Sequence, residues 1–188
     1  LVENAIKHGI RGCEGGGTIS LTIYRNVDVL DWAEQNGLRI ERPDMGLAER
    51  LGDTGCDWVL SIANLDILSA AVLGFGQKGA VNFHDGPLPH YAGLNVPVWA
   101  LLNGEREHGI TWHLISDGVD EGDIIAQRMF DISPDDTALT LNAKCYGAAI
   151  DSFDEVISAL SNDVPERHAQ DLSKRSYFGR NLRPKGLG

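Results

Sequence analysis

Residues 82–89 read Asn-Phe-His-Asp-Gly-Pro-Leu-Pro and begin at the end of a short apolar run that predicts a β-strand over 80–83. Each proline fixes its own φ and restricts the residue before it, so the loop after this strand is stiff. A stiff loop can hold the side chains of Asn82 and His84 in a cleft. An amide that donates to a developing oxyanion and an imidazole that moves a proton suit acyl transfer to an amine.

A second polar loop, residues 117–123, reads Asp-Gly-Val-Asp-Glu-Gly-Asp and contains four acids. One of these carboxylates can orient the imidazole of His84 and stabilise its charge. The spacing alone does not decide which acid points inward. Taken separately, each loop has a simpler interpretation. Asn82 would be a turn residue, His84 a structural histidine, and the 117–123 loop a solvent-exposed hairpin. Their combination favours a site, provided that the loops meet in space.

Predicted strands and helices alternate along the chain, which is typical of an α/β protein with a mostly parallel, Rossmann-like sheet and flanking helices. Ligands in such sheets bind at the carboxyl ends of strands. The last two strands have no helix between them and should be antiparallel neighbours. The helix at 28–37 begins at Asp28 and stops at Gly37, and Asp136 or Thr137 caps the last one. The expected strands are 18–24, 38–40, 57–63, 80–83, 109–116 and 123–130, and the expected helices are 2–8, 28–37, 47–51, 67–75, 96–102 and a long final one with an apolar stripe from Tyr146 to Leu160.

The composition narrows the class of protein. The 188 residues, 43% of them hydrophobic, are enough for one good core. The net charge of -11 disfavours nucleic acid as a partner. The apolar runs at 58–63 and 70–75 are far shorter than the roughly 20 residues of a membrane helix, and the N-terminus carries no secretion signal. We therefore expect no membrane association and a cytoplasmic location.

The three cysteines, Cys13, Cys56 and Cys145, are odd in number and widely spaced. This pattern indicates neither a disulfide framework nor a metal site. Among the histidines, His113 is expected to be an outward or cross-strand residue of its strand, and His90 and His108 are expected to be exposed loop residues.

The C-terminal segment departs from the acidic trend of the chain. It is either an exposed linker or a docking strip, and the linker is the favoured interpretation. From Asp171 onward a single acid faces five bases, Lys174, Arg175, Arg180, Arg183 and Lys185.

The first nine residues, Leu-Val-Glu-Asn-Ala-Ile-Lys-His-Gly, resemble the helix that binds magnesium and ATP in sensor histidine kinases, and residues 16–19 resemble the strand after it. The glycine-rich boxes that would close over a nucleotide are absent. Residues 1–26 are therefore interpreted as a foreign or fused segment without kinase activity, and a regulatory ATP-binding module is the least favoured function.

From Val27 onward the chain resembles the folate-dependent formyltransferase fold. Within that fold it is most similar to the formylation domains at the start of nonribosomal peptide synthetases, such as that of linear gramicidin. The resemblance implies a catalytic domain over 27–165 and a basic tail or linker over 166–188. It also implies that the family's first strand and helix are missing, displaced by residues 1–26. The matching stretches are 56–64, 82–93, 99–102, 109–113, 119–123 and 171–178.

The resemblance implies that Asn82, His84 and Asp120 are the catalytic trio and that the formyl donor is N10-formyltetrahydrofolate, with no metal. The amine of the acceptor would attack the formyl carbon while Asn82 and protonated His84 stabilise the oxyanion. The pterin pocket would be lined by Leu65, Asp66, Leu68, Asp117, Gly118 and Val119.

The acceptor implied by the resemblance is the amine of a carrier-bound aminoacyl group, with an adenylation domain as the neighbouring partner. Residues 85–89 stand where many relatives have Ser-Leu-Leu-Pro, which fits the peptide-synthetase branch and argues against the tRNA branch. Two alternatives stay open. One is an N-formyltransferase for sugar nucleotides or free amino acids, and the other is a truncated or fused fragment without activity.

Overall fold

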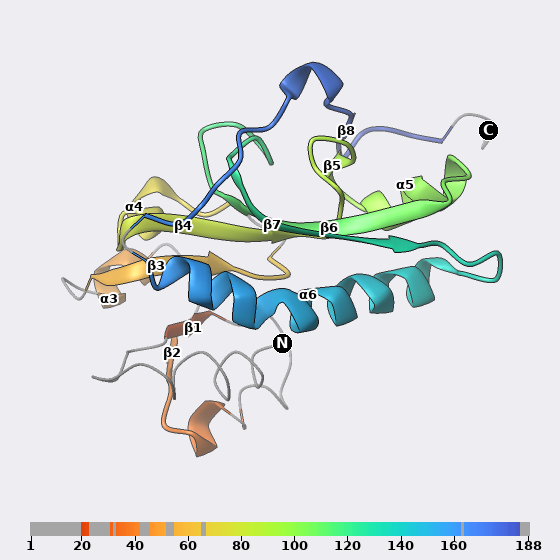
Figure 1. The fold of residues 1–188 in the computed structure, drawn as a ribbon. Helices are drawn as coiled ribbons and strands as arrows, with labels where there is room; N and C mark the ends of the chain where they lie inside the picture. The colour runs from red at the N-terminus through yellow and green to blue at the C-terminus, as the bar shows by residue number, and fades with distance from the viewer. Residues whose placement is uncertain are drawn as a thin grey trace.

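The computed structural model describes residues 20–22, 31, 33–41, 46–51, 55–64, 67–162 and 164–184. Within these ranges strands and helices alternate as predicted (Figure 1). The elements are β1 (Ser20–Thr22), β2 (Arg39–Glu41), α3 (Leu47–Leu51), β3 (Cys56–Ser61), α4 (Ala70–Leu73), β4 (Gly76–His84), β5 (Ala92–Gly93), α5 (Val96–Leu102), β6 (Glu107–Leu114), β7 (Ile124–Asp131), α6 (Ala138–Leu160), the 3-10 helix η2 (Leu172–Lys174) and β8 (Tyr177–Phe178).

The main sheet has the strand order β3-β4-β6-β7. β3 and β4 are parallel, whereas β4 with β6 and β6 with β7 are antiparallel, so the described sheet is mixed. The predicted antiparallel pairing of the last two long strands is confirmed. Two short parallel pairs, β1 with β2 and β5 with β8, lie outside this sheet.

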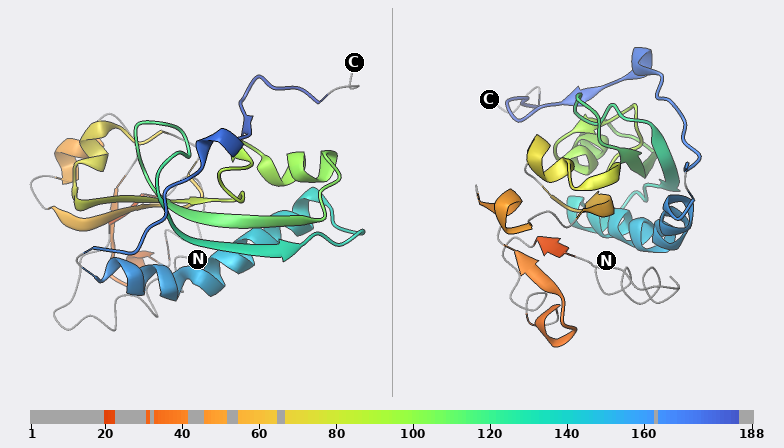
Figure 2. Two further views of the ribbon diagram at one scale, coloured as in Figure 1. Left: turned by 45° about the horizontal axis from the view of Figure 1, so that its top comes forward. Right: turned by 90° about the vertical axis from the view of Figure 1, so that its left-hand side faces the viewer.

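Helix α6 covers one face of the sheet along most of its length (Figures 1 and 2). Both predicted caps contribute to its start. Thr137 and Thr140 form a reciprocal capping box, and the carboxylate of Asp136 accepts from the Ser133 amide and the Thr140 hydroxyl. The predicted apolar stripe faces the sheet along Ala149, Phe153, Val156 and Leu160, but Tyr146 is 41% exposed.

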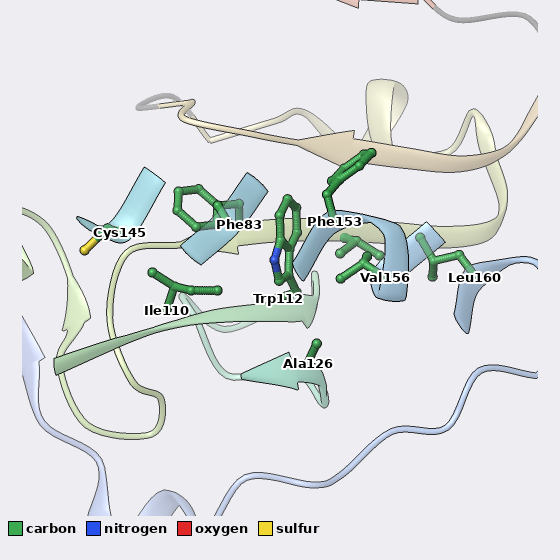
Figure 3. Close-up of a cluster of buried hydrophobic side chains, with 10 residues drawn as sticks. Phe83, Ile110, Trp112, Ala126, Cys145, Phe153, Val156 and Leu160 are labelled. Carbon is green, nitrogen blue, oxygen red and sulfur yellow. The ribbon is translucent and has the colours of Figure 1, made fainter. Parts of the chain in front are cut away.

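The core between α6 and the sheet contains three packed aromatic rings among mainly aliphatic side chains. The Trp112 ring lies 5.2 Å from that of Phe83 and 5.6 Å from that of Phe153, measured between centroids (Figure 3). Phe83 and Trp112 are cross-strand partners in the register of β4 and β6, as are Asn82 and His113. Because side chains alternate along a strand, the first pair faces α6 and the second faces the opposite side of the sheet. The sheet therefore separates an apolar core from a polar face.

Several predicted boundaries shift in the structure. The helix expected at 67–75 is the shorter α4, which Ser69 caps, because β4 begins as early as Gly76. The strand expected at 57–63 is β3, which is only partly buried and forms the edge of the described sheet. Gly37, where the helix was expected to stop, has a left-handed backbone, at φ 67°. The predicted helix at 2–8 and the cap at Asp28 lie outside the described residues.

Residues 168–178 of the expected linker contact the domain at both ends, although most of their side chains are exposed. His168 and Ile124 exchange two backbone hydrogen bonds, of 2.8 and 2.9 Å. β8 pairs with β5, and the Phe178 ring lies 5.1 Å from that of Tyr91 and 5.0 Å from that of Trp99. Aromatic burial holds this part of the tail on the domain.

None of the helices in the described ranges is long and apolar enough to cross a membrane.

Candidate active site

The end of β4 carries the first two candidate residues. Asn82 and His84 are two positions apart on one strand, so both project from the face opposite α6. His84 is 5% exposed. Thr111 ties down the loop that follows, because it donates to the Gly86 carbonyl at 2.8 Å and accepts from the Leu88 amide at 3.1 Å. The stiffness expected from the prolines is therefore reinforced by hydrogen bonds from β6.

Asp120 is the acid of the 117–123 loop that points inward. Its side chain is 11% exposed, with one oxygen 3.7 Å from His84 Nδ1 and the other 3.5 Å from His113 Nε2. The Gly93 amide donates to it at 2.8 Å. The structure thus brings Asn82, His84 and Asp120 to one place. Of the other three acids, Glu121 pairs with Arg175, Asp123 pairs with Arg167, and Asp117 is exposed.

The two ring nitrogens of His84 have different surroundings. Nε2 lies 2.7 Å from the Tyr91 carbonyl oxygen. A carbonyl oxygen only accepts, so Nε2 carries a hydrogen and donates it there. Nδ1 faces the carboxylate of Asp120 at 3.7 Å, beyond hydrogen-bonding distance. Nδ1 is therefore the nitrogen through which His84 can exchange a proton with a bound substrate.

His113 is a cross-strand residue, as expected, but it faces the site rather than outward, and it is 3% exposed. Its Nδ1 donates to the Leu114 carbonyl at 2.8 Å. In the neutral ring Nε2 is then an acceptor, and it takes a hydrogen from the Asn82 amide at 3.2 Å. This bond orients the Asn82 side chain and leaves its second amide hydrogen for another acceptor.

The electrostatics of the site favour an ionised Asp120. Burial acts to raise the pKa of Asp120, but the His113 side chain 3.5 Å away, the charge of His84 and the bond from Gly93 together lower it below its ordinary value. The carboxylate therefore stays charged at neutral pH and can stabilise a positive charge on a neighbouring imidazole.

A second carboxyl, Asp85, directly follows His84. Burial raises its pKa, against the lowering effect of the His84 charge. The carbonyl of Asp85 accepts from His108 Nε2 at 2.8 Å. His108 is wholly buried in β6, so the expectation that it is an exposed loop residue is wrong, whereas His90 is exposed as expected. Burial also lowers the pKa of His108.

The raised pKa of Asp85 predicts a pH-dependent cost to stability. Because the pKa of Asp85 is raised in the folded state, folding favours its protonated form. This contribution to stability is complete below pH 3.8, the ordinary pKa of the group, and is lost as the pH rises through the folded-state pKa. The Asp85→Asn variant should therefore be more stable than the wild type at neutral pH, by about 1 kcal/mol. Urea unfolding measures this difference, which should vanish near about pH 3. Asp154→Asn, at an exposed site of α6, is the control. Equal stabilities of Asp85→Asn and wild type at pH 7 would contradict the prediction.

Gly86 lets the backbone of the loop pass close to His84. A Cβ at this position would lie 2.7 Å from the Tyr91 carbonyl oxygen, 2.8 Å from His84 Nε2 and 2.9 Å from a methyl group of Val96. Gly86→Ala should therefore destabilise the protein by about 1–3 kcal/mol and displace the His84 ring. Urea unfolding and the NMR shifts of the His84 ring measure the two effects. Gly147→Ala, where a Cβ would meet nothing within 4 Å, is the matched control.

The residues proposed for the pterin pocket are only partly described. Leu65 and Asp66 lie outside the described residues. Leu68 is half-buried and belongs to the segment that follows β3. This segment begins next to Asn82, because Ser61 at the end of β3 pairs with Asn82 in the sheet. Asp117, Gly118 and Val119 belong to the loop that carries Asp120. Across the described ranges, no cluster of His, Cys, Asp or Glu side chains is arranged to hold a metal ion.

Sequence reasoning missed the residues that hold the trio in place. His113 orients Asn82, the Tyr91 carbonyl anchors His84, and the Gly93 amide binds Asp120. Alternation along 109–116 placed His113 on the face opposite Trp112, but only the register of β4 and β6 shows that Asn82 lies across from it.

Comparison with known proteins decides the family. The pattern of the formyl transferase family matches residues 25–157. The chain belongs to the formyl transferase family. The formyltransferase fold implied by the resemblance from Val27 onward is therefore confirmed, and Asn82, His84 and Asp120 lie within the matched range.

Three solved structures show how widely this fold is shared. The sugar 3N-formyltransferase WlaRD, solved with dTDP and 5-N-formyl-THF, is 27% identical with a TM-score of 0.67 over 81% of this chain and 53% of its own. The N-formyltransferase from Helicobacter canadensis, in complex with folinic acid and dTDP-3-aminofucose, is 24% identical with a TM-score of 0.72. The match covers 95% of this chain and 65% of that enzyme. Phosphoribosylglycinamide formyltransferase from Streptococcus pneumoniae is 23% identical with a TM-score of 0.71. The match covers 86% of this chain and 92% of that enzyme. This chain thus spans little more than half of the length of WlaRD.

Proposed function

We propose that the protein transfers a formyl group from N10-formyltetrahydrofolate to an amine. The observation that carries this proposal is the convergence of Asn82, His84 and Asp120 on the polar face of the sheet. His84 Nδ1 and an oxygen of Asp120 are 3.7 Å apart, and the Asn82 amide is aligned by His113. Membership of the formyl transferase family supports formyl transfer as the chemistry of this trio.

The reaction forms one C–N bond and breaks another. The acceptor amine attacks the formyl carbon, and the carbonyl oxygen becomes an oxyanion. The free hydrogen of the Asn82 amide and a proton on His84 Nδ1 stabilise this oxyanion. As the intermediate collapses, the bond from the formyl carbon to N10 of the folate breaks. His84 gives its Nδ1 proton to N10 as this bond breaks and then takes the proton that the attacking amine loses, so the imidazole ends as it began.

Asp120 supports both tasks of His84. Its carboxylate is ionised and lies beside Nδ1, so it stabilises the imidazolium that forms when His84 holds the proton. The Tyr91 carbonyl keeps the other nitrogen occupied, which prevents the ring from turning away. In this proposal the pterin pocket is lined by Leu68 and residues 117–119, with Leu65 and Asp66 as the other lining residues.

The acceptor that we propose is the amine of an aminoacyl group on a carrier protein in peptide natural-product biosynthesis. Support comes from the similarity of residues 85–89 and 171–178 to the formylation domains of nonribosomal peptide synthetases. A neighbouring adenylation domain would load the carrier. A sugar-nucleotide amine is the second candidate, and the 27% identity to a sugar 3N-formyltransferase favours it.

A competition assay tests the donor and the acceptor together. The protein is mixed with N10-formyltetrahydrofolate and with three acceptors: an aminoacyl carrier protein, a dTDP-amino sugar and a free amino acid. Mass spectrometry identifies the formylated product, and a His84→Ala variant measures the background. Formylation of the carrier-bound group supports the proposal, whereas formylation of the sugar alone overturns the proposed acceptor.

Folate binding separates an enzyme with another acceptor from an inactive fragment. Calorimetry with 5-formyltetrahydrofolate, a stable analogue of the donor, measures binding without turnover. Circular dichroism melting shows whether the chain unfolds cooperatively. A protein that melts broadly, binds no folate and formylates none of the acceptors would be an inactive fragment, and the proposed function would be wrong.

A further inference from the structure

The segment 168–178, called here the strap, crosses the domain next to the loop that carries Asp120 (Figures 1 and 2). One end is anchored where His168 pairs with Ile124 of β7. At the other end Ser176 accepts from the Ala92 amide at 2.9 Å, and Phe178 from the Leu94 amide at 2.8 Å. The strap thus links β7 to β5 on either side of the candidate site.

Between these anchors the strap side chains hold the loop by its carbonyl groups. Gln170 Nε2 donates to the Asp120 carbonyl at 2.9 Å and to the Gly122 carbonyl at 2.6 Å. Arg175 donates to the Val119 carbonyl at 2.9 Å. Two side chains from the strap therefore bind the backbone on both sides of the Asp120 side chain.

The loop needs this support because Asp120 has an unfavourable backbone conformation. Its φ is 55°, in the left-handed region that non-glycine residues seldom occupy. Such conformations persist where the surroundings hold them in place. Hydrogen bonds to the neighbouring carbonyls supply that restraint, and the same backbone geometry aims the Asp120 carboxylate at His84 and Gly93.

We propose that Gln170 and Arg175 are positioning residues for Asp120. This inference rests on the proposed function, since its purpose is to keep the Asp120 carboxylate beside His84. The strap side chains divide into two groups. Gln170 and Arg175 contact the loop, whereas Ser173 and Lys174 contact Asp171 of the strap itself. The second group therefore provides matched controls.

The kinetic test replaces the amide of Gln170 with a carboxylate. Gln170→Glu keeps the size of the side chain, but an ionised carboxylate has no hydrogen to donate and faces two carbonyl oxygens. We expect kcat for formyl transfer to fall about 100-fold while KM for both substrates changes by less than about twofold. Ser173→Ala and Lys174→Met should keep the wild-type kcat. An unchanged kcat in Gln170→Glu would overturn the proposal.

Hydrogen exchange provides a readout that needs no turnover. The Gly93 amide reports on Asp120 because it donates to the carboxylate, whereas the Ile115 amide donates to the Ala80 carbonyl and reports on the sheet. In Gln170→Glu the Gly93 amide should exchange about tenfold faster, and the Ile115 amide should not change. Equal acceleration at both amides would show a general loss of stability and would overturn the positioning role.

A second variant guards against a folding defect in the first. Arg175→Met removes the bond to the Val119 carbonyl and should also accelerate exchange at Gly93 more than at Ile115. If the wild type formylates no acceptor, the proposed function fails, but the Gly93 amide still decides whether the strap positions Asp120. A fall in kcat with normal protection of Gly93 would overturn the proposal.

Discussion

Asp120→Asn is expected to lower kcat for formyl transfer by about 10³- to 10⁴-fold. The neutral amide cannot stabilise the imidazolium of His84. Its NH₂ group can also face His84 Nδ1, 3.7 Å from the present carboxylate, and compete for the nitrogen that exchanges the proton. Single-turnover formylation at saturating donor measures the chemical step directly. The loss of activity at acid pH that comes from protonation of the Asp120 carboxylate should be absent from the variant.

The Asp120→Asn variant should fold normally. Asparagine tolerates the left-handed backbone, with φ at 55°, better than most residues, and its oxygen can still accept from the Gly93 amide. Asp123→Asn is the control, because Asp123 lies in the same part of the chain and only pairs with the exposed Arg167. A kcat of Asp120→Asn within about tenfold of the wild type would rule out its charge as a catalytic element.

Asn82→Asp is expected to lower kcat by about 10²- to 10³-fold. An ionised carboxylate has no hydrogen for the oxyanion and places a second negative charge where the negative charge of the intermediate develops. It also loses the bond that the Asn82 amide makes to His113 at 3.2 Å. Steady-state kinetics with the preferred acceptor measures the effect, which should appear in kcat more than in KM because the oxyanion exists only on the reaction path.

The control for Asn82→Asp is Asn162→Asp, an exposed position just after α6. It introduces the same charge far from the sheet face that carries the candidate site and should leave kcat unchanged. Two results would contradict the role of Asn82 as an oxyanion donor. One is an Asn82→Asp variant with wild-type kcat, and the other is a defect confined to KM.

Local patterns in the sequence predicted most of the secondary structure. The apolar run before Asn82, the left-handed glycine at Gly37 and the threonine cap at Thr137 each act within a few residues, so neighbouring residues are enough to recognise them. Boundaries were less accurate where two elements compete for the same residues. β4 begins at Gly76, so the preceding helix is only as long as α4. Pairing with β3 stabilises the residues from Gly76 onward as a strand.

The candidate site depends on contacts between distant parts of the chain. The sequence carries four acids in 117–123, and only the folded loop, with Asp120 at φ 55° and bound to Gly93, shows which one points inward. His113 and His108 lie on opposite faces of β6, one against Asn82 and the other against Asp85. No pattern near either histidine reports such a partner, because cross-strand pairing joins residues more than twenty positions apart.

The residues 82–89 determined, by themselves, that a strand ends in a stiff loop with an amide and an imidazole two positions apart. That much follows from backbone preferences and alternation, which are local properties. The family resemblance pointed to Asp120, and the tertiary structure placed its carboxylate beside His84. Only the tertiary structure showed that His113 aligns Asn82 and that the strap holds the loop through Gln170 and Arg175. These arrangements depend on sheet register and on chain packing across the domain, and the free energy that selects them comes from contacts formed only when the whole core is assembled.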